Sequence, residues 1–444
     1  MRYPSPPLVT LLLAGTVGAL TPKMQSLKDI SVGVGEQLPT GFIGVGARAM
    51  GMGGAHIGGA LDGTALYWNP AALTRVRRIE LLGGLTHGRP YASADVGLPT
   101  LGSPVVTGAS TAVTSLNTLV ITAPYPTYRG GLTFALGVTR PEDYAYRARQ
   151  DGVVVLSGTD YAQQDEVRQS GGLSQYAMGM GVEVSPTISL GGALIWYHGN
   201  VKVTRSLSLL DQVGTPPDSL IGTYRQSNSI NGVSLTVGTS IALPLGFDLG
   251  ALAVPPVTYE MEGKWGDEYA EAIGQNVFHY DYVEKKLHYK IESPWQLGVG
   301  LTWATYAVTL STDLWYADWR QARFDGSPYG SSSGINAETF FEDRYRQKLR
   351  WHVGGEVLLP WISTYLRGGY YYDPDPFRGP VLDTGEAVAY ARSGSYYTVG
   401  AGWLIEKTLT ADVAFVYGGE RFTVGNITEK RTTRRLFLTL GFRL

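Results

Sequence analysis

The side chains that could do chemistry do not form a recognised catalytic or metal-binding pattern. The sequence has no cysteine, and its six histidines are His56, His87, His198, His279, His288 and His352. No two of them have the spacing of the zinc-binding motif HExxH, and no Gly-x-Ser-x-Gly turn supports a hydrolase. His352 and Ser363 could face the same side of neighbouring strands as a base and a nucleophile. The favoured interpretation is a histidine that hydrogen-bonds to polar neighbours such as Arg350, so we expect no enzyme activity, metal site or cofactor.

A glycine- and alanine-rich stretch at residues 44–73 is the most distinctive part of the chain. Its run Gly51-Met52-Gly53-Gly54 is similar to a phosphate-binding loop, but the Lys-Ser/Thr pair of such a loop is missing. Small residues let backbone pack against backbone inside a confined space, which predicts a plug. At the end of the stretch, Asn69 can cap a short helix whose first turn accepts proline. The residues expected to build the plug are Arg48, Gly51, Gly53, Gly54, Asn69, Pro70 and Ala71.

Composition indicates a large β-barrel. The chain has 444 residues with only 17% charged, a net charge of -2, 58 glycines and 28 tyrosines. This balance gives no reason to expect a nucleic-acid partner. No linker or low-complexity tract divides the chain, so we predict one closed unit. Arg2, the apolar run 8–20 and the small residues before position 20 predict a signal peptide over residues 1–19.

Alternation of apolar and polar residues recurs in segments of about ten residues. In the last segment Leu436, Leu438, Leu440, Phe442 and Leu444 share one face. In a membrane barrel such a face meets lipid, while the other face lines the lumen. Charges expected in the lumen, which could tether the plug or bind a carboxylate, are Glu80, Glu183, Asp313, Arg350, Glu356, Arg367, Asp412 and Arg435.

The pattern predicts an all-β protein, a transmembrane antiparallel barrel of about fourteen strands. The strands are expected near 78–88, 115–124, 130–140, 172–184, 187–199, 228–241, 246–256, 286–302, 305–318, 346–358, 362–373, 394–405, 408–418 and 432–444. Short turns alternate with long loops, which predicts both termini on the periplasmic side. The expected parts are a plug at 20–77 and a barrel at 78–444, in the outer membrane of a diderm bacterium.

The glycine-rich stretch also resembles the N-terminal hatch of the FadL/TodX family of outer-membrane transporters. The residues that carry the likeness run from Arg48 to Ala55 and from Asp62 to Ala71, ending in Trp68-Asn69-Pro70-Ala71. The resemblance implies passive transport of long-chain fatty acids or hydrocarbons through a plugged barrel. It also implies a lateral exit at a kinked third strand, here at Gly130, Gly131 and Gly137.

Two long loops carry apolar residues that could bind the ligand. Trp265, Tyr269, Ile273 and Val277 recur every four residues, which predicts a short amphipathic helix. A second patch precedes it at Leu207, Leu209, Leu210 and Val213. In the resembled family, two such loops form a groove that captures the ligand. The alternative is that the two patches bury each other as a lid.

Two other functions remain open at this stage. Relatives with the same barrel, of the PorV type, belong to protein secretion systems, so the loops could instead hold a cargo protein. An outer-membrane hydrolase is the least favoured function. For the transporter, the expected partners are a hydrophobic small molecule and the surrounding outer-membrane lipid and lipopolysaccharide, with the protein acting as a monomer.

Overall fold

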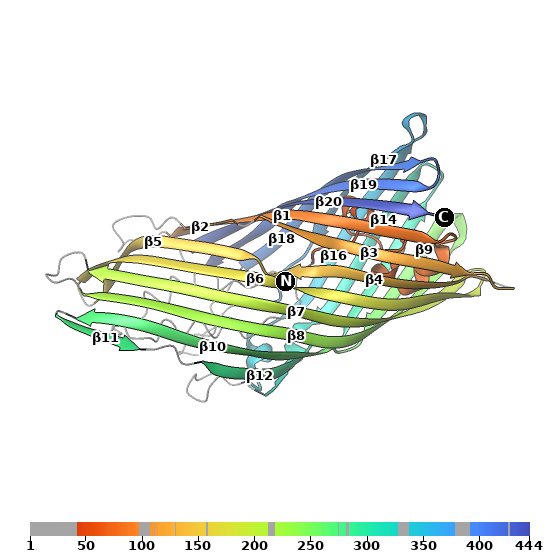
Figure 1. The fold of residues 1–444 in the computed structure, drawn as a ribbon. Helices are drawn as coiled ribbons and strands as arrows, with labels where there is room; N and C mark the ends of the chain where they lie inside the picture. The colour runs from red at the N-terminus through yellow and green to blue at the C-terminus, as the bar shows by residue number, and fades with distance from the viewer. Residues whose placement is uncertain are drawn as a thin grey trace.

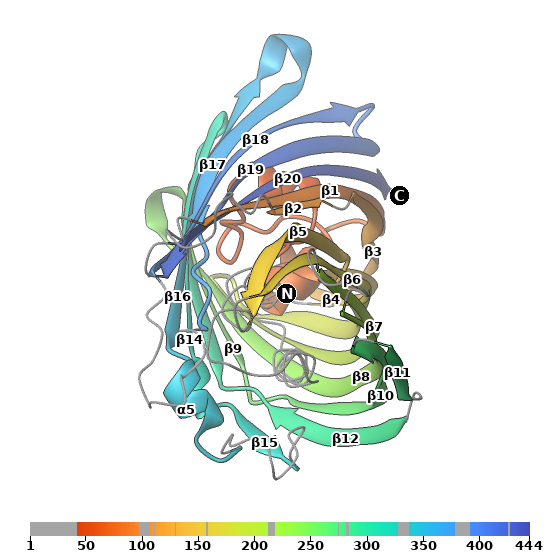
Figure 2. The same cartoon turned by 90° about the vertical axis from the view of Figure 1, so that its left-hand side faces the viewer.

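The computed structural model describes residues 42–96, 107–110, 112–128, 130–156, 159–211, 218–273, 275–280, 284–326, 337–377, 391–424 and 427–444. The predicted signal peptide and the first part of the predicted plug lie outside these residues. Strands dominate, and they wrap around a hollow that contains the N-terminal part of the chain (Figures 1 and 2). Among the described residues, no helix is long and apolar enough to cross a membrane.

In the described chain, twenty strand segments form one antiparallel sheet. They are β1 (Glu80–Val96), β2 (Thr107–Ser110), β3 (Val113–Tyr125), β4 (Leu132–Asp143), β5 (Tyr146–Leu156), β6 (Thr159–Ser185), β7 (Ile188–Asp211), β8 (Ser219–Ala242), β9 (Phe247–Val254), β10 (Thr258–Ile273), β11 (Asn276–Tyr280), β12 (Lys285–Glu292), β13 (Gln296–Ala304), β14 (Val308–Asp318), β15 (Arg323–Asp325), β16 (Gln347–Leu359), β17 (Thr364–Tyr372), β18 (Ala391–Ile405), β19 (Leu409–Val424) and β20 (Ile427–Arg443).

The sheet closes on itself because β1 pairs with β3 on one side and with β20 on the other. In the described chain, β2, β5 and β11 extend the wall at its long-loop end, while β9/β10, β12/β13 and β14/β15 are each one interrupted strand. Fourteen strands therefore form the closed wall, which confirms the predicted fold class. In the described residues, each of the fourteen wall strands therefore has a strand partner on both sides, although β11 and β15 have one partner each.

Alternation along the strands sorts side chains between the outside and the lumen. On β20, Leu438 and Leu440 are 48% and 60% exposed, whereas Phe437 and Thr439, which alternate with them, are buried. The same alternation exposes Leu297 and Val299 on β13. The predicted alternation of apolar and polar residues is therefore present, and the apolar outer face is suited to contact with lipid.

The predicted amphipathic helix at residues 265–277 is wrong. Trp265, Tyr269 and Ile273 lie on β10, and Val277 lies on β11. A spacing of four residues is also a multiple of the two-residue repeat of a strand, so it places side chains on one face of either element. The predicted long loop at 200–227 is likewise mostly strand, because β7 and β8 continue well beyond the predicted ends.

Three short helices remain in the described chain beside four 3-10 turns: α3 (Ala47–Gly51), α4 (Ala65–Trp68) and α5 (Phe340–Arg344). The 3-10 turns are η1 (Pro70–Arg75), η2 (Pro244–Gly246), η3 (Trp319–Gln321) and η4 (Pro360–Ile362). Helices α3 and α4 and the turn η1 belong to residues 42–79, called the inner segment below. Figure 2 shows this segment, in red and orange, enclosed by the strands.

Candidate functional site

The inner segment is held compact by its own polar contacts. The Asn69 side chain accepts a hydrogen bond from the Ala71 amide at 3.1 Å, with Pro70 in the first position of η1. The same side chain donates to the carbonyl of Ile57. The indole of Trp68 donates to the carbonyl of Val45 at 3.0 Å and so ties the two ends of the segment together. The predicted cap at Asn69 is thus present, and it begins a 3-10 turn.

Glycines on the wall face the inner segment at van der Waals distance. A Cβ atom at Gly191 would lie 2.3 Å from the Ala71 amide, and one at Gly354 would lie 2.1 Å from the Met52 carbonyl. Similar limits apply on both sides of the lumen, at Gly137, Gly179, Gly181, Gly238, Gly250, Gly300, Gly369 and Gly400. These positions leave little or no space for a Cβ atom, because backbone or side-chain atoms of the inner segment lie directly against the wall backbone.

Glycines of the inner segment make the matching approach. Gly53 has a φ of 67°. A Cβ atom at this position would clash with the carbonyl of Val353 and with the backbone of Tyr370. At Gly54, φ is 73° and a Cβ atom would lie 2.9 Å from His352 Nδ1. The sequence run that is similar to a phosphate loop therefore serves backbone packing in this structure.

Wall side chains bind the backbone of the inner segment. Asp313 accepts the amide of Ile57 at 2.8 Å, and Glu80 accepts the amide of Gly63 at 2.7 Å. Asn117 both accepts from Gly46 and donates to the carbonyl of Gly44. Asn117 occupies the register shift between β1 and β3, and a bulge of this kind re-aims a side chain. Two of the predicted lumen charges are thus tethers, whereas Asn117 was not identified from the sequence.

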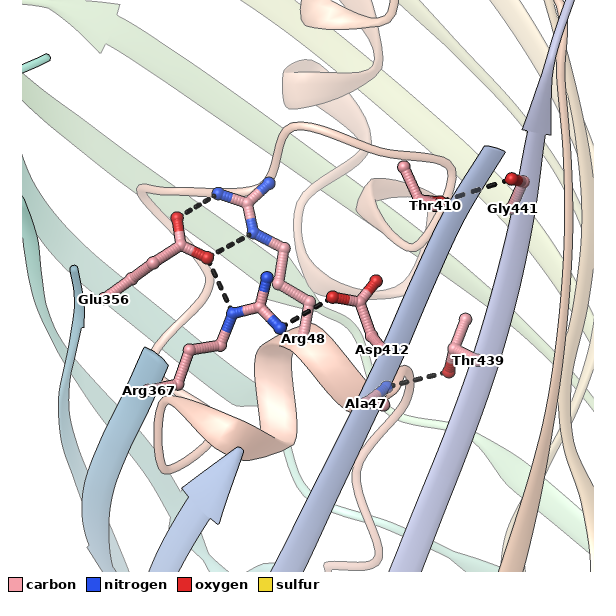
Figure 3. Close-up of polar contacts among 8 residues, drawn as sticks. All are labelled: Ala47, Arg48, Glu356, Arg367, Thr410, Asp412, Thr439 and Gly441. Atoms are coloured by element: carbon pink, nitrogen blue, oxygen red, sulfur yellow. Dashed lines mark hydrogen bonds and ion pairs between the residues drawn. The ribbon is translucent and has the colours of Figure 1, made fainter. Parts of the chain in front are cut away.

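A chain of charged contacts joins α3 to the wall (Figure 3). Arg48 binds Glu356 with one nitrogen at 2.9 Å, and Glu356 also accepts from Arg367 at 2.6 Å. Arg367 in turn reaches Asp412 at 2.6 Å. We call these four residues the Arg48 cluster. Beside it, the Ala47 amide donates to Thr439 at 2.9 Å.

A polar cavity of about 200 Å³ adjoins the Arg48 cluster, at the end of the barrel with the short turns. Trp403 and Thr410, on either side of the turn at Glu406 and Lys407, lie on its wall. Leu61, which is 44% exposed, stands at its rim. The cavity is large enough for several water molecules, so the charges around it have a source of hydration.

His56 and Asp62 are buried within the inner segment near this cavity. Burial lowers the pKa of His56 to about 4, although Asp62 opposes the shift. Burial would raise the pKa of Asp62, but His56, Arg48 and the hydrogen bonds from Thr64 lower it overall. At neutral pH, His56 is therefore an uncharged imidazole beside an ionised carboxylate.

His352 and Ser363 do not form a catalytic pair. His352 is fully buried, and its Nδ1 atom lies 2.6 Å from the carbonyl of Gly53. Ser363 is exposed at the end of η4, one residue before β17 begins, although the predicted strand at 362–373 included it. The partner of His352 on β17 is Tyr371, eight residues beyond Ser363, or about 26 Å along the strand. The hydrolase hypothesis loses its geometric basis.

The predicted lateral-exit glycines occupy two different places. Gly130 and Gly131 lie in the turn before β4, whereas Gly137 lies in the middle of β4. A Cβ atom at Gly137 would lie 3.1 Å from Leu66 and 2.9 Å from the hydroxyl of Tyr67. The pairing of β4 with β6 is irregular just beyond, between Thr139 and Glu142.

Outside the same part of the wall is an apolar depression of about 530 Å³. It is lined by lipid-facing residues of β1, β3, β4, β6 and β7, which include Leu119, Leu136, Tyr176, Met178 and Trp196. At Gly137, therefore, only a strand backbone separates the inner segment from the lipid-facing surface.

The predicted groove residues are divided among several surfaces. Leu207 and Leu209 are buried with Leu220 on the lumen side of β7 and β8, whereas Leu210 is exposed on the opposite face. The ring of Trp265 lies 6.1 Å from that of Tyr224, and the Lys285 amine stands 4.7 Å above the Trp265 ring.

The remaining groove residues give less information. Val277 is exposed on β11. Val213 lies outside the described residues, and the side chains of Tyr269 and Ile273 are not described. Leu207 and Tyr269 align with the same residue, Gly222 of β8. The described residues of the two predicted patches thus lie mostly on strands of one sheet and not in separate loops.

Comparisons with known proteins agree on one architecture. The family model described as outer membrane protein transport protein (OMPP1/FadL/TodX) matches residues 35–440. A FadL homologue from Pseudomonas aeruginosa is similar in structure, with a TM-score of 0.59 and 13% identity over 90% of this chain and 98% of that one. The toluene transporter TodX from Pseudomonas putida gives 0.58 and 16%, with the same coverage. TbuX from Ralstonia pickettii, also a toluene transporter, gives 0.53 and 15%, again over 90% and 98%. A search of curated protein sequences finds no match.

Proposed function

We propose a route and a ligand class for this chain, which belongs to the OMPP1/FadL/TodX family of outer-membrane transport proteins. The protein is an outer-membrane β-barrel that transports hydrophobic compounds. The proposed ligands are long-chain fatty acids or hydrocarbons, since structural neighbours include two toluene transporters. The proposed route runs down a concentration gradient from the lumen, through the wall at Gly137, into the membrane.

The observation that carries this proposal is the coincidence of three features at Gly137. The strand is free of side chains on its lumen side there, its ladder to β6 is irregular nearby, and an apolar depression lies directly outside. An apolar molecule that passes at this point reaches an apolar outer surface directly. It therefore avoids the free-energy cost of entering the aqueous periplasm.

The inner segment would act as the hatch that keeps the lumen closed to polar solutes. Leu66 and Tyr67 lie directly behind Gly137, so a small shift of α4 would uncover the wall at this point. The corresponding division is a signal peptide at 1–19, a hatch at 20–77 and a barrel at 78–444. Because the wall closes within one chain, a monomer surrounded by lipid and lipopolysaccharide suffices for this route.

A disulfide across the β4–β6 ladder tests the route. Leu136 and Met178 are cross-strand partners on the lipid-facing side, and the chain has no cysteine of its own. We expect that Leu136→Cys/Met178→Cys, once oxidised, lowers uptake of labelled oleate and toluene about tenfold, because the ladder can no longer part. Reduction should restore uptake.

The matched control is Val299→Cys/Leu314→Cys, an equivalent cross-strand pair between β13 and β14. Its oxidation should leave uptake unchanged. Equal loss in both variants, or no loss in the first, would contradict an exit at β4. The comparisons give no support to the alternative of a secretion-system component, so uptake is the appropriate measurement.

A further inference from the structure

The lumen has two chemically different sides. On β7, the inward side chains between positions 193 and 203 are Ala193, Ile195, Tyr197, Val201 and Val203, and all are buried; the buried Arg205 follows them towards the long-loop end. On β16, across the lumen, the inward side chains include Lys348, Arg350, His352 and Glu356. The apolar side leads towards Gly137, whereas the charged side leads towards the Arg48 cluster and the polar cavity.

Charged contacts continue along the β16 side. Near its long-loop end, Lys348 pairs with Asp373 at 2.6 Å. Arg350 stands 4.7 Å above the ring of Phe42, at the start of the inner segment. Glu356 then meets Arg48 at the cavity. Polar side chains thus follow β16 from its long-loop end to its short-turn end, and we call this row the polar column. The inner segment lies against it.

The charges of the Arg48 cluster balance only when the inner segment is in place. The wall contributes two carboxylates, Glu356 and Asp412, and one guanidinium, Arg367, so its own sum is one negative charge. Arg48 supplies the missing positive charge from α3. If α3 moves away, the uncompensated carboxylate remains beside the polar cavity, where water can hydrate it.

We propose that the inner segment can open at the Arg48 cluster, where it gives water and small ions, and not solutes as large as sugars, a water-filled and cation-preferring route to the periplasm. Release of Arg48 from Glu356 lets α3 leave the β16–β19 wall and joins the polar column to the cavity. Contacts on the opposite side, such as that between Ala71 and Gly191, stay in place. This route is separate from the lateral exit and goes beyond the proposed transport of hydrophobic compounds.

Two substitutions with opposite charge outcomes test the opening. Arg48→Gln leaves one net negative charge in the cluster, and Glu356→Gln leaves one net positive charge. In planar bilayers, both should raise the open probability at least about tenfold, because each breaks the same buried ion pair. In a KCl gradient, the reversal potential of Arg48→Gln should show cation preference, and that of Glu356→Gln should shift towards anions.

A general loosening of the protein would give both variants the same selectivity, and that result would overturn the proposal. Unchanged conductance in both would also overturn it. Heat-modifiable migration on gels verifies that each barrel is folded. Arg77→Gln is the matched control, because Arg77 pairs with Glu183 at the other side of the inner segment and is 66% exposed. Its conductance should equal that of the unmodified protein.

A reversible lock identifies the moving part. The Ala47 amide lies 2.9 Å from the Thr439 hydroxyl, and both positions already carry a Cβ atom, so Ala47→Cys/Thr439→Cys can link α3 to β20. When this pair is added to Arg48→Gln, oxidation should abolish the extra conductance and reduction should restore it. Persistent conductance after oxidation would place the leak elsewhere and contradict an opening at α3. Because the readout is ion flow, the result is independent of hydrocarbon uptake through β4.

Discussion

The β7 side and the β16 side of the lumen hold the inner segment by different means. At β7 and β8 the segment packs directly on glycines, with the Pro70 backbone on Gly191 and the Asn69 side chain on Gly238, and Arg75 adds one ion pair with Asp248 of β9. At β16 and β17 it also depends on ion pairs beside a polar cavity. Close packing loses its contacts when the two surfaces separate, whereas ion pairs next to water can exchange their partners for water. The same segment can therefore be fixed on one side and releasable on the other.

Removal of the inner segment should abolish the difference between the two sides and have the largest effect on permeability. Deletion of residues 47–68 takes away Arg48 and most of the backbone that packs on the wall glycines. We expect small sugars to enter liposomes that carry the variant and not those with the intact protein. A liposome swelling assay measures this. Unchanged permeability would show that the inner segment does not close the lumen.

A charge on the apolar side should have the next largest effect. Ile195 is buried and faces the lumen from β7. Ile195→Asp places a carboxylate without a partner in that surface, at a cost of about 3 kcal/mol or more. Both the uptake of labelled toluene and the thermal stability of the barrel should decrease. Lys348→Arg keeps the charge on the opposite side and should leave both quantities nearly unchanged. Equal losses of uptake and stability in the two variants would show that the two sides of the lumen do not differ in this respect.

Acid should weaken only the charged side. His56 has a pKa of about 4 in the folded protein against 6.5 for a free imidazole, because burial disfavours its charged form. The native state thus binds fewer protons, so stabilisation is complete above pH 6.5 and is lost as the pH falls towards 4. The loss is at most about 3 kcal/mol.

The charged groups around His56 are Asp62, Arg48, Glu356, Arg367 and Asp313, whose carboxylate accepts the His56 backbone amide. Conductance should rise between pH 6.5 and 4, and His56→Gln should flatten that rise. The measurement is a bilayer titration at constant salt. A pH response that survives in His56→Gln would assign the effect to another group.

The smallest effect is expected from the cap on the packed side. Asn69 binds the Ala71 amide and the carbonyls of Ile57 and Thr239. Asn69→Ala should lower the free energy of unfolding by about 1–2 kcal/mol, because it removes a cap and leaves buried groups unpaired. Differential scanning calorimetry in detergent measures the change. Ion selectivity should stay constant, since the substitution leaves the charged side intact.

Several features of the molecule followed from local sequence alone. The alternation at 435–444 predicts a strand with one lipid-facing side because the strand repeat is a property of the backbone. The glycine and alanine run at 44–73 predicts close backbone packing for the same kind of local reason. The cap at Asn69 also needs only its nearest neighbours. By contrast, Trp265, Tyr269 and Ile273 have a spacing that fits a helix and a strand equally, so the sequence could not choose between them.

Tertiary structure decided which residues meet. Arg48 and Glu356 are 308 positions apart, and Gly46 and Asn117 are 71 apart. Nothing in the local pattern at Glu356 distinguishes it from other inward charges on the wall, because the barrel register alone brings it opposite α3. The cavity beside the Arg48 cluster and the depression outside Gly137 are likewise made by several strands at once. The sequence by itself determined a barrel with a glycine-rich interior segment, and closure of the sheet determined where that segment is packed and where it is held by charge.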